Sequence, residues 1–258
     1  MMRTLLKMTW LEMKLFAREP LTVAFAFALP VIMLFVLGEV FGNTPDPQGK
    51  FYRGVGPMDF YTPAYVGLVL ASAGLLAMPV HLTGYRERGV LRRFRASSVP
   101  IWALLGAQVL VTVAMGIVGA VTISVASRLV YGVGFPRSIL GFVGAFLLSA
   151  LAFSAIGVLL GSVLPTARAA QGLGIILFFT MFVLGGGGPP REVMTSVMRR
   201  IGDVLPLTHV VHVLQDPWLD FSWSGVEIGI VAMVFVGAAA LSAIAFRWEW
   251  LPQGDRTG

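Results

Sequence analysis

The stretch SILGFVGAFLLSALAFSAIGVLLGSV, residues 138–163, carries no charged side chain along its whole length. A helix needs about 20 apolar residues to cross the roughly 30 Å hydrocarbon core of a bilayer, and this stretch is long enough. A segment that faces lipid must form hydrogen bonds within itself for all its backbone N–H and C=O groups, so the stretch is expected to be helical. With the other apolar runs, the expected spans are residues 21–41, 60–83, 100–130, 138–163, 169–188 and 224–247. The sequence therefore predicts an all-α membrane protein with six transmembrane helices.

The composition indicates one membrane domain over residues 1–258. Hydrophobic residues make up 57% of the chain and charged residues 12%, against roughly 25% charged residues in ordinary soluble domains. Apolar runs recur along the whole length, and no polar half forms a second domain. The chain has no cysteine, which excludes disulfides and cysteine-based metal or redox sites.

The basic residues are distributed unevenly between the connections. Of the 19 Lys and Arg residues, 12 lie in the N-terminal segment, the loops 84–98 and 164–168 and the tail from Arg247, and 7 lie in the other three connections. Because cytoplasmic segments carry the excess of Lys and Arg, both termini are predicted to be cytoplasmic. This topology also explains the net charge of +6 without nucleic-acid binding. The strong preference for Arg over Lys is typical of a high-GC bacterium, so we expect a multi-pass protein of the bacterial cytoplasmic (inner) membrane.

Residues 1–19 are expected to form an amphipathic helix that lies in the cytoplasmic interface. On a helical wheel the basic side chains fall within about 60° of one another, and they are Arg3, Lys7, Lys14 and Arg18. An apolar arc lies beside them, formed by Leu5, Leu6, Trp10, Met13 and Phe16. Met8, Leu11 and Leu15 interrupt the polar face, so a cytosolic extension of the first span is an alternative.

The most informative loop has the sequence YRERGVLRRFRASSVP, residues 85–100, between the second and third spans. It combines five arginines and one glutamate with interleaved apolar residues. A basic loop of this kind is also expected where a protein binds anionic lipid head groups.

The C-terminal third contains two further motifs, GGGGPPRE at residues 185–192 and LPLTHVVHVLQ at residues 205–215. Together with the 84–98 loop, they resemble the permeases of the type-2 ABC exporter family (ABC-2 type transmembrane subunits), and most of all the drug- and antibiotic-resistance branch. The resemblance extends over nearly the whole chain. It implies that residues 185–222 form a short re-entrant helical excursion between the fifth and sixth spans. His209 is a departure, because the family commonly has an aromatic residue there.

The resemblance implies a non-catalytic permease that works as a dimer with two cytosolic ABC ATPases. ATP and Mg would be bound by these partners, and this chain would bind no cofactor. Residues 84–97 would form a coupling helix in a groove of the ATPase, and the expected ATPase-coupling residues are Arg86, Glu87, Arg88, Leu91, Arg92, Arg93, Arg18 and Glu19. The first, second and fifth spans would face the cavity of the dimer. Four phenylalanines could line an apolar substrate path there or instead face lipid: Phe35, Phe178, Phe179 and Phe182.

The motifs for other chemistry are absent from the sequence. Residues 185–188 are glycines, but a phosphate-binding P-loop needs Gly-Lys-Ser/Thr at its end, and prolines follow here. The sequence has no Gly-x-Ser-x-Gly elbow and no His-Glu-x-x-His motif. His209, His212 and Asp216 share a helical face, and with His81 they would permit a metal site; the alternative is a polar face of an interfacial helix.

The expected activity is export of a hydrophobic or amphipathic substrate, such as a drug, an antibiotic or a lipid-like molecule, from the cytoplasm or inner leaflet. An ion- or proton-coupled secondary carrier is one alternative, but the ionisable residues in the spans are Glu39, His81 and Glu227, all near span ends. A membrane scaffold or sensor that transports nothing is the other alternative, and it would require no ATPase.

Overall fold

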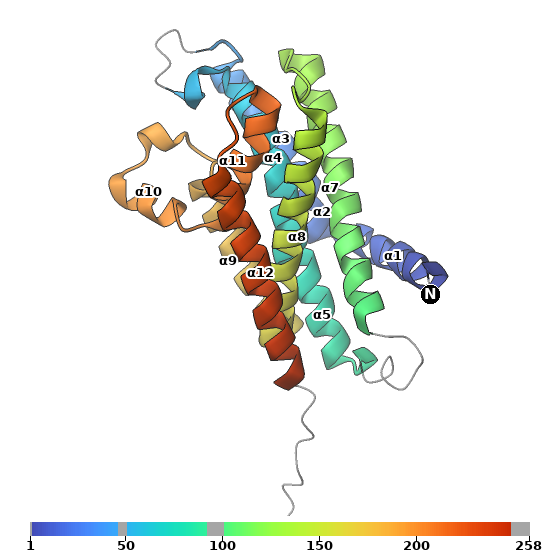
Figure 1. The fold of residues 1–258 in the computed structure, drawn as a ribbon. Helices are drawn as coiled ribbons and strands as arrows, with labels where there is room; N and C mark the ends of the chain where they lie inside the picture. Colours follow the sequence, from blue (N-terminus) through green and yellow to red (C-terminus); the bar gives the residue numbers. More distant parts are fainter. Residues whose placement is uncertain (1, 46–50, 92–100, 249–258) are drawn as a thin grey trace, which may run out of the picture.

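The described part of the chain is helical throughout (Figure 1), and the computed structural model describes residues 2–45, 51–91 and 101–248. No strand occurs within these ranges. The α-helices are α1 (Met2–Ala17), α2 (Pro20–Val23), α3 (Leu29–Phe41), α4 (Pro57–Ser72), α5 (Met78–Glu87), α7 (Ile101–Tyr131), α8 (Ile139–Val163), α9 (Ala167–Leu184), α10 (Ser196–Gly202), α11 (Pro206–Leu219) and α12 (Gly225–Trp248). Two π-helical turns, η1 (Ala24–Ala28) and η3 (Ala73–Ala77), and two 3-10 turns, η2 (Tyr52–Gly54) and η4 (Arg191–Val193), complete the set.

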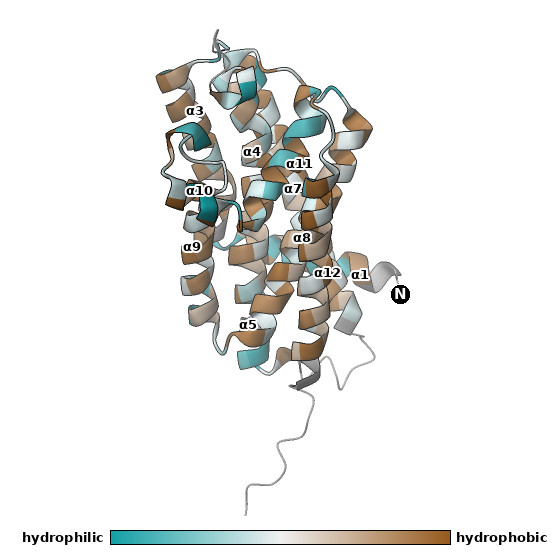
Figure 2. Cartoon of the chain, turned by 60° about the vertical axis from the view of Figure 1, so that its left-hand side comes forward, coloured by the Kyte–Doolittle hydropathy of each residue, from teal (hydrophilic) through white to brown (hydrophobic). Residues whose placement is uncertain are grey.

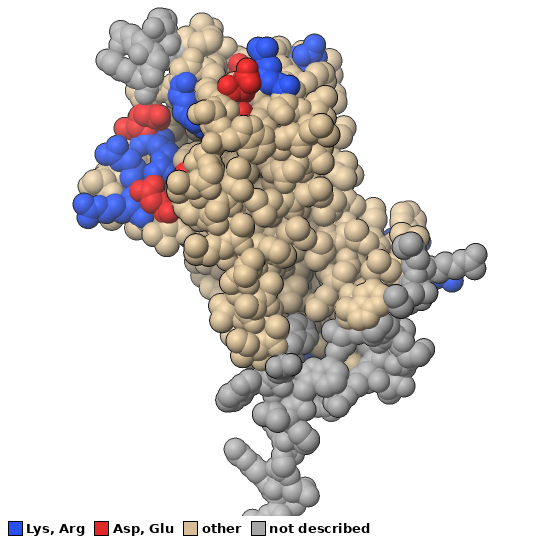
Figure 3. Space-filling model, viewed as in Figure 1, with Lys and Arg blue, Asp and Glu red and all other residues tan. Residues whose placement is uncertain are grey.

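The prediction of six membrane-spanning helices is confirmed for length and apolar composition. The candidate spans are Ala24–Phe41, Pro57–Glu87, Trp102–Tyr131, Ile139–Val163, Ala167–Leu184 and Gly225–Ala245. The second span is longer at both ends than the expected 60–83, and the fifth ends before the glycines that begin at Gly185. Figure 2 shows hydrophobic residues along the outer faces of α9 and α12 and hydrophilic residues on α10. Figure 3 shows charged side chains around α10 and at the nearby end of the bundle, with a broad uncharged band below them.

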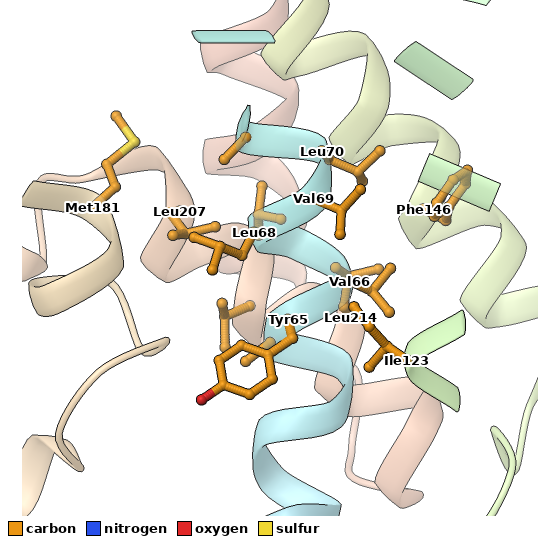
Figure 4. Close-up of a cluster of buried hydrophobic side chains, with 14 of the residues drawn as sticks. Tyr65, Val66, Leu68, Val69, Leu70, Ile123, Phe146, Met181, Leu207 and Leu214 are labelled. Carbon is orange, nitrogen blue, oxygen red and sulfur yellow. The ribbon is translucent and has the colours of Figure 1, made fainter. Parts of the chain in front are cut away.

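The second span, formed by α4, η3 and α5, is the central helix of the bundle. In its most apolar window 94% of the residues are buried, whereas the first and sixth spans have 22% and 17%. Figure 4 shows side chains of α4 directed toward Ile123 of α7, Phe146 of α8 and Leu214 of α11. The other helices are therefore arranged around α4 and α5, and they present their own outer faces to the surroundings.

Glycines allow the central helix to approach its neighbours closely. A Cβ atom built at Gly157 of α8 would lie 2.4 Å from the carbonyl oxygen of Gly74, and one built at Gly74 would lie 2.4 Å from the carbonyl oxygen of Phe153. On α9, a Cβ atom at Gly174 would lie 2.3 Å from the carbonyl oxygen of Leu75. Small residues at such positions let helix backbones come into contact. The π-helical turn η3 thus lies between glycine contacts from α8 and α9.

Each π-helical turn is followed closely by a proline. Pro30 and Pro79 are each the second residue after such a turn, and the amides of Leu29 and Met78 donate to the carbonyls of Ala24 and Ala73, five residues back. Proline has no N–H and its ring clashes with the preceding turn, so a wider turn accommodates it within a continuous helix.

Two ends of the bundle carry the remaining features. The α5 end is the end at which α5 and α8 stop and α9 begins, and the α11 end is the opposite one, where α3 stops and α12 begins. Figure 1 shows α1 extending sideways from the half of the bundle that contains α5, while α10 projects on the other side. α1 contacts α7, and Phe16 of α1 is buried with Ala73 and Val111. Whether α1 lies in a membrane interface stays a prediction, as does the re-entrant character of residues 185–222.

The glycine contacts generate the first prediction. Gly157→Ala should destabilise the protein by about 1–3 kcal/mol, because the new methyl group meets the Gly74 backbone, which cannot move aside without separating α8 from the second span. Gly144→Ala is the matched control, since it lies on the same helix and a Cβ atom there meets nothing within 4 Å. The thermal unfolding midpoint in detergent measures both. Equal midpoints for the two variants would show that the close approach does not support the fold.

Candidate functional site

Arg86 braces the end of α5 against the end of α8. Its guanidinium donates to the carbonyl oxygens of Ser162 at 2.9 Å and Gly161 at 3.3 Å, and it also bonds the carbonyl oxygen of Leu164. The last carbonyls of a helix have no intrahelical partner, and Arg satisfies them with a charge that suits the helix C-terminus. Arg86 was expected to contact an ATPase, but its side chain is turned toward the bundle.

Glu87 makes the corresponding contact with α9. A carboxylate oxygen of Glu87 accepts from the backbone amide of Ala167 at 3.2 Å, and the Thr166 hydroxyl caps the same helix by accepting from Ala169 at 3.1 Å. Negative charge near the first turn of a helix stabilises it. Consecutive residues of α5 therefore hold the end of α8 and the start of α9.

The expected 84–98 loop includes these two residues, because its first four residues belong to α5 in the structure. Gly89 has φ +67°, a left-handed conformation that favours glycine, and it ends α5. Arg88 is exposed and bonds the Gly84 carbonyl of its own helix at 3.1 Å. Leu91 packs partly against a buried cluster that includes Leu82 and Leu104. Arg92 and Arg93, both expected coupling residues, lie outside the described residues.

Arg18 and Glu19 lie where α1 meets α2. Arg18 is exposed, and a carboxylate oxygen of Glu19 lies 2.8 Å from Nε2 of His81 on α5. The structure thus brings the expected Glu19 together with the second span, one and a half turns before Arg86.

A buried polar cluster that the sequence analysis did not identify lies beside Glu19. Glu12 of α1 is 3% exposed, and its two carboxyl oxygens accept from the Tyr85 hydroxyl and from Nε2 of Gln108, each at 2.7 Å. Nδ1 of His81 lies 3.8 Å from the same carboxyl group. The available signal was a single acid between the apolar residues Trp10 and Phe16 of the predicted amphipathic helix.

A cavity of about 320 Å³ opens where α2, just before the first span, meets the second and fifth spans. It is lined by Arg18, Glu19, Pro20, Leu21, Leu76, Val80, Gln171 and Ile175. Charged and amide groups form one part of the lining and aliphatic side chains the rest, a combination that suits an amphipathic molecule. Its volume is within the range of about 300–1,000 Å³ typical of small-molecule sites.

Phe178 and Phe179, which were expected on the substrate path, lie one turn farther along α9 from this cavity. Phe178 is fully buried and Phe179 is 38% exposed. Their rings lie 5.6 and 5.4 Å from that of Phe25 on η1, which the sequence analysis did not single out. Phe182 is partly buried, and Phe35 packs near Tyr131 of α7, with ring centroids 6.3 Å apart. Two of the four phenylalanines therefore join the first and fifth spans, while Phe35 faces the third.

The histidines of the α11 end join α11 to α12. Nδ1 of His209 lies 2.5 Å and Nδ1 of His212 lies 3.2 Å from the carboxylate of Glu227, and burial lowers the pKa of His212. Asp216 instead pairs with Arg53 at 3.3 Å. His81 lies at the α5 end, so it cannot join them, and no metal-binding group of three His, Cys, Asp or Glu occurs in residues 2–45, 51–91 and 101–248. The metal alternative from the sequence therefore receives no support.

Comparison with known proteins gives one family. The family model described as ABC-2 type transporter matches residues 3–217, which is well over half of the 258-residue chain. The match begins in α1 and ends in α11, so it includes the brace, the buried polar cluster and the cavity. No curated protein matches the chain.

The brace generates the second prediction. Arg86→Lys should lower stability by about 1–3 kcal/mol, because one ammonium group cannot reach all three carbonyls at the end of α8 and charged hydrogen bonds are lost. Arg88→Lys is the control, since the Arg88 guanidinium is exposed and bonds a carbonyl of its own helix. Thermal unfolding in detergent distinguishes the variants. If Arg86→Lys melts at the same temperature as Arg88→Lys, the contacts to α8 contribute nothing measurable.

Proposed function

Because the chain belongs to the ABC-2 type transporter family, it is the membrane-spanning permease of an ABC transporter, and we propose that it exports its substrate with energy from a separate cytosolic ATPase. The permease itself is non-catalytic. ATP and Mg would be bound by the ATPase, in agreement with the lack of a P-loop in this sequence. The proposed location is the bacterial cytoplasmic membrane, with both termini and the α5 end on the cytoplasmic side.

The observation that carries this proposal is the way the 84–98 loop is attached. Arg86 and Glu87 lie in the last turn of α5, within residues 84–98, and they bond the end of α8 and the start of α9. A displacement of the loop by an ATPase would therefore move the ends of three helices together. An ordinary lipid-anchoring loop has no need for such attachment.

The contacts of the expected coupling residues suggest two different roles. Arg86 and Glu87 bond the neighbouring helices α8 and α9, while the exposed Arg88 bonds a carbonyl of its own helix and is available to an ATPase. We assign the contact with the ATPase groove to Arg88, Leu91, Arg92 and Arg93, with Arg18 and Glu19 beside it. Closure of the two ATPases would then drive the permease between inward-open and outward-open states.

The proposed substrate is a hydrophobic or amphipathic molecule, such as a drug, an antibiotic or a lipid-like compound. The 320 Å³ cavity supports this, since Arg18 and Gln171 provide polar groups while Leu76 and Ile175 provide an apolar wall. The partly exposed Phe179 ring continues the apolar surface one turn farther along α9, where it packs against the rings of Phe25 and the buried Phe178. Entry would occur at the cytoplasmic leaflet, next to the ATPase.

A second permease copy would complete the transport path. The first and fifth spans each have only 22% of their most apolar window buried, and they leave large side chains such as Val36 and Ile176 exposed. The fifth span lines the cavity through Gln171 and Ile175, and α2 leads from the cavity into the first span, so a partner packed on these faces would enclose it. Lipid would cover the same faces in the isolated chain.

An ion-coupled carrier fits the described spans less well. Their acids are Glu39, Asp59, Glu87 and Glu227, and each lies within two residues of a span end. A proton or ion relay usually places acids deep in the membrane. In the described spans no acid has that position.

The third prediction tests the proposed ATPase contact. Arg88→Glu should reduce the amount of co-purified ATPase at least tenfold, because disrupting a partly desolvated ion pair costs about 2–5 kcal/mol and about 1.4 kcal/mol corresponds to tenfold. Arg200→Glu is the matched control, an exposed arginine on α10 at the other side of the molecule. The experiment uses the full chain co-expressed with its partner ABC ATPase. Parental yield with Arg88→Glu, or an equal loss with Arg200→Glu, would contradict the proposal.

A further inference from the structure

Glu12 joins the two helices on either side of the 84–98 loop. Its carboxyl group accepts from Tyr85 near the end of α5 and from Gln108 near the start of α7, each at 2.7 Å. α5 leads into the loop and α7 follows it. The Glu12 carboxyl group therefore connects the helix that precedes the loop to the helix that follows it.

The contacts continue toward the cavity. His81 lies on α5, with Nδ1 3.8 Å from the Glu12 carboxyl and Nε2 2.8 Å from that of Glu19. Glu19 borders the 320 Å³ cavity together with Arg18. A continuous series of polar groups therefore extends from the loop roots through α1 to the polar lining of the cavity.

Attachment of α1 alone does not require this cluster. Phe16, one turn farther along α1, is already buried against Ala73 and Val111 and provides apolar contact with the second and third spans. Buried polar groups are costly unless they are paired, and apolar residues of similar size often stabilise a protein as well or better. A hydrogen-bonded cluster differs in being directional, because it is satisfied only in particular helix arrangements.

We propose that Glu12 is a positioning residue that transmits movement of the 84–98 loop to α1 and to the polar lining of the cavity. The proposal rests on the proposed function, since it assumes that an ATPase moves the loop. When α5 and α7 shift relative to each other, Tyr85 and Gln108 can no longer both bond the Glu12 carboxyl. α1 must then follow one of them, and Glu19 at the cavity moves with it.

The test is a hydrogen-bond swap. Glu12→Leu should reduce the stimulation of ATP hydrolysis by the permease substrate about tenfold, and Glu12→Gln should reduce it less. In both variants the amount of co-purified ATPase should equal that of the parent. The double variant Glu12→Gln with Gln108→Glu returns one carboxyl and one amide to the same pair, and it should recover stimulation to within about threefold of the parent. The probes are a panel of hydrophobic cations and detergent-like drugs, with the complex in liposomes.

Phe16→Leu is the control for a purely structural role. It weakens the apolar contact of the same helix, so it should lower the thermal unfolding midpoint and leave the stimulation ratio unchanged. Parental stimulation in Glu12→Leu, or no recovery in the swapped double variant, would overturn the inference while the ATPase still co-purifies. If the unmodified chain does not co-purify with the ATPase, the proposed function is wrong, and the inference that rests on it is wrong as well.

Discussion

A helix inside a bilayer has no water to satisfy its backbone, and the rest of this structure follows from that constraint. The second span takes the central position, and its neighbours pack on it through glycine contacts, as between Gly157 and the Gly74 carbonyl. π-Helical turns accommodate Pro30 in the first span and Pro79 in the second. The central helix is thus both the best-packed element and the one with the widened turn η3 at its middle, where α8 and α9 approach it.

The same constraint explains the chemistry of the α5 end. Helix ends leave carbonyls and amides without partners, and here side chains of α5 satisfy those of two neighbouring helices through Arg86 and Glu87. Glu12 satisfies donors from α5 and α7 in a similar way. Residues that complete the fold therefore also connect the 84–98 loop to α1, α7, α8 and α9. In the proposed exporter, the same hydrogen bonds would satisfy the polar groups at the helix ends and transmit movement of the loop to the neighbouring helices.

The sequence was sufficient for the six spans, because length and apolar composition alone define them. It misjudged the ends of the second span, since Asp59 and Tyr85 look like loop residues until their partners Asn43 and Glu12 are known. The site was predicted only in part. Glu87 and Glu19 were identified, but their partners on α9 and α5 depend on tertiary contacts that no local pattern reveals. Glu12 and Phe25 were missed for the same reason, and Phe35 was grouped with Phe178 although it faces a different helix.

The central claim is that the α5 end lies in the cytoplasm and docks on an ATPase. The chain has no cysteine, so a photo-reactive or thiol-reactive probe can be placed at one position without background. In cells that co-express the partner ABC ATPase, a cross-linker at position 88 is predicted to capture the ATPase, and the same cross-linker at position 200 is predicted to capture none. Position 88 should also resist labelling by a membrane-impermeant reagent applied outside intact cells. Capture from position 200 alone, or labelling of position 88 from outside, would contradict the account.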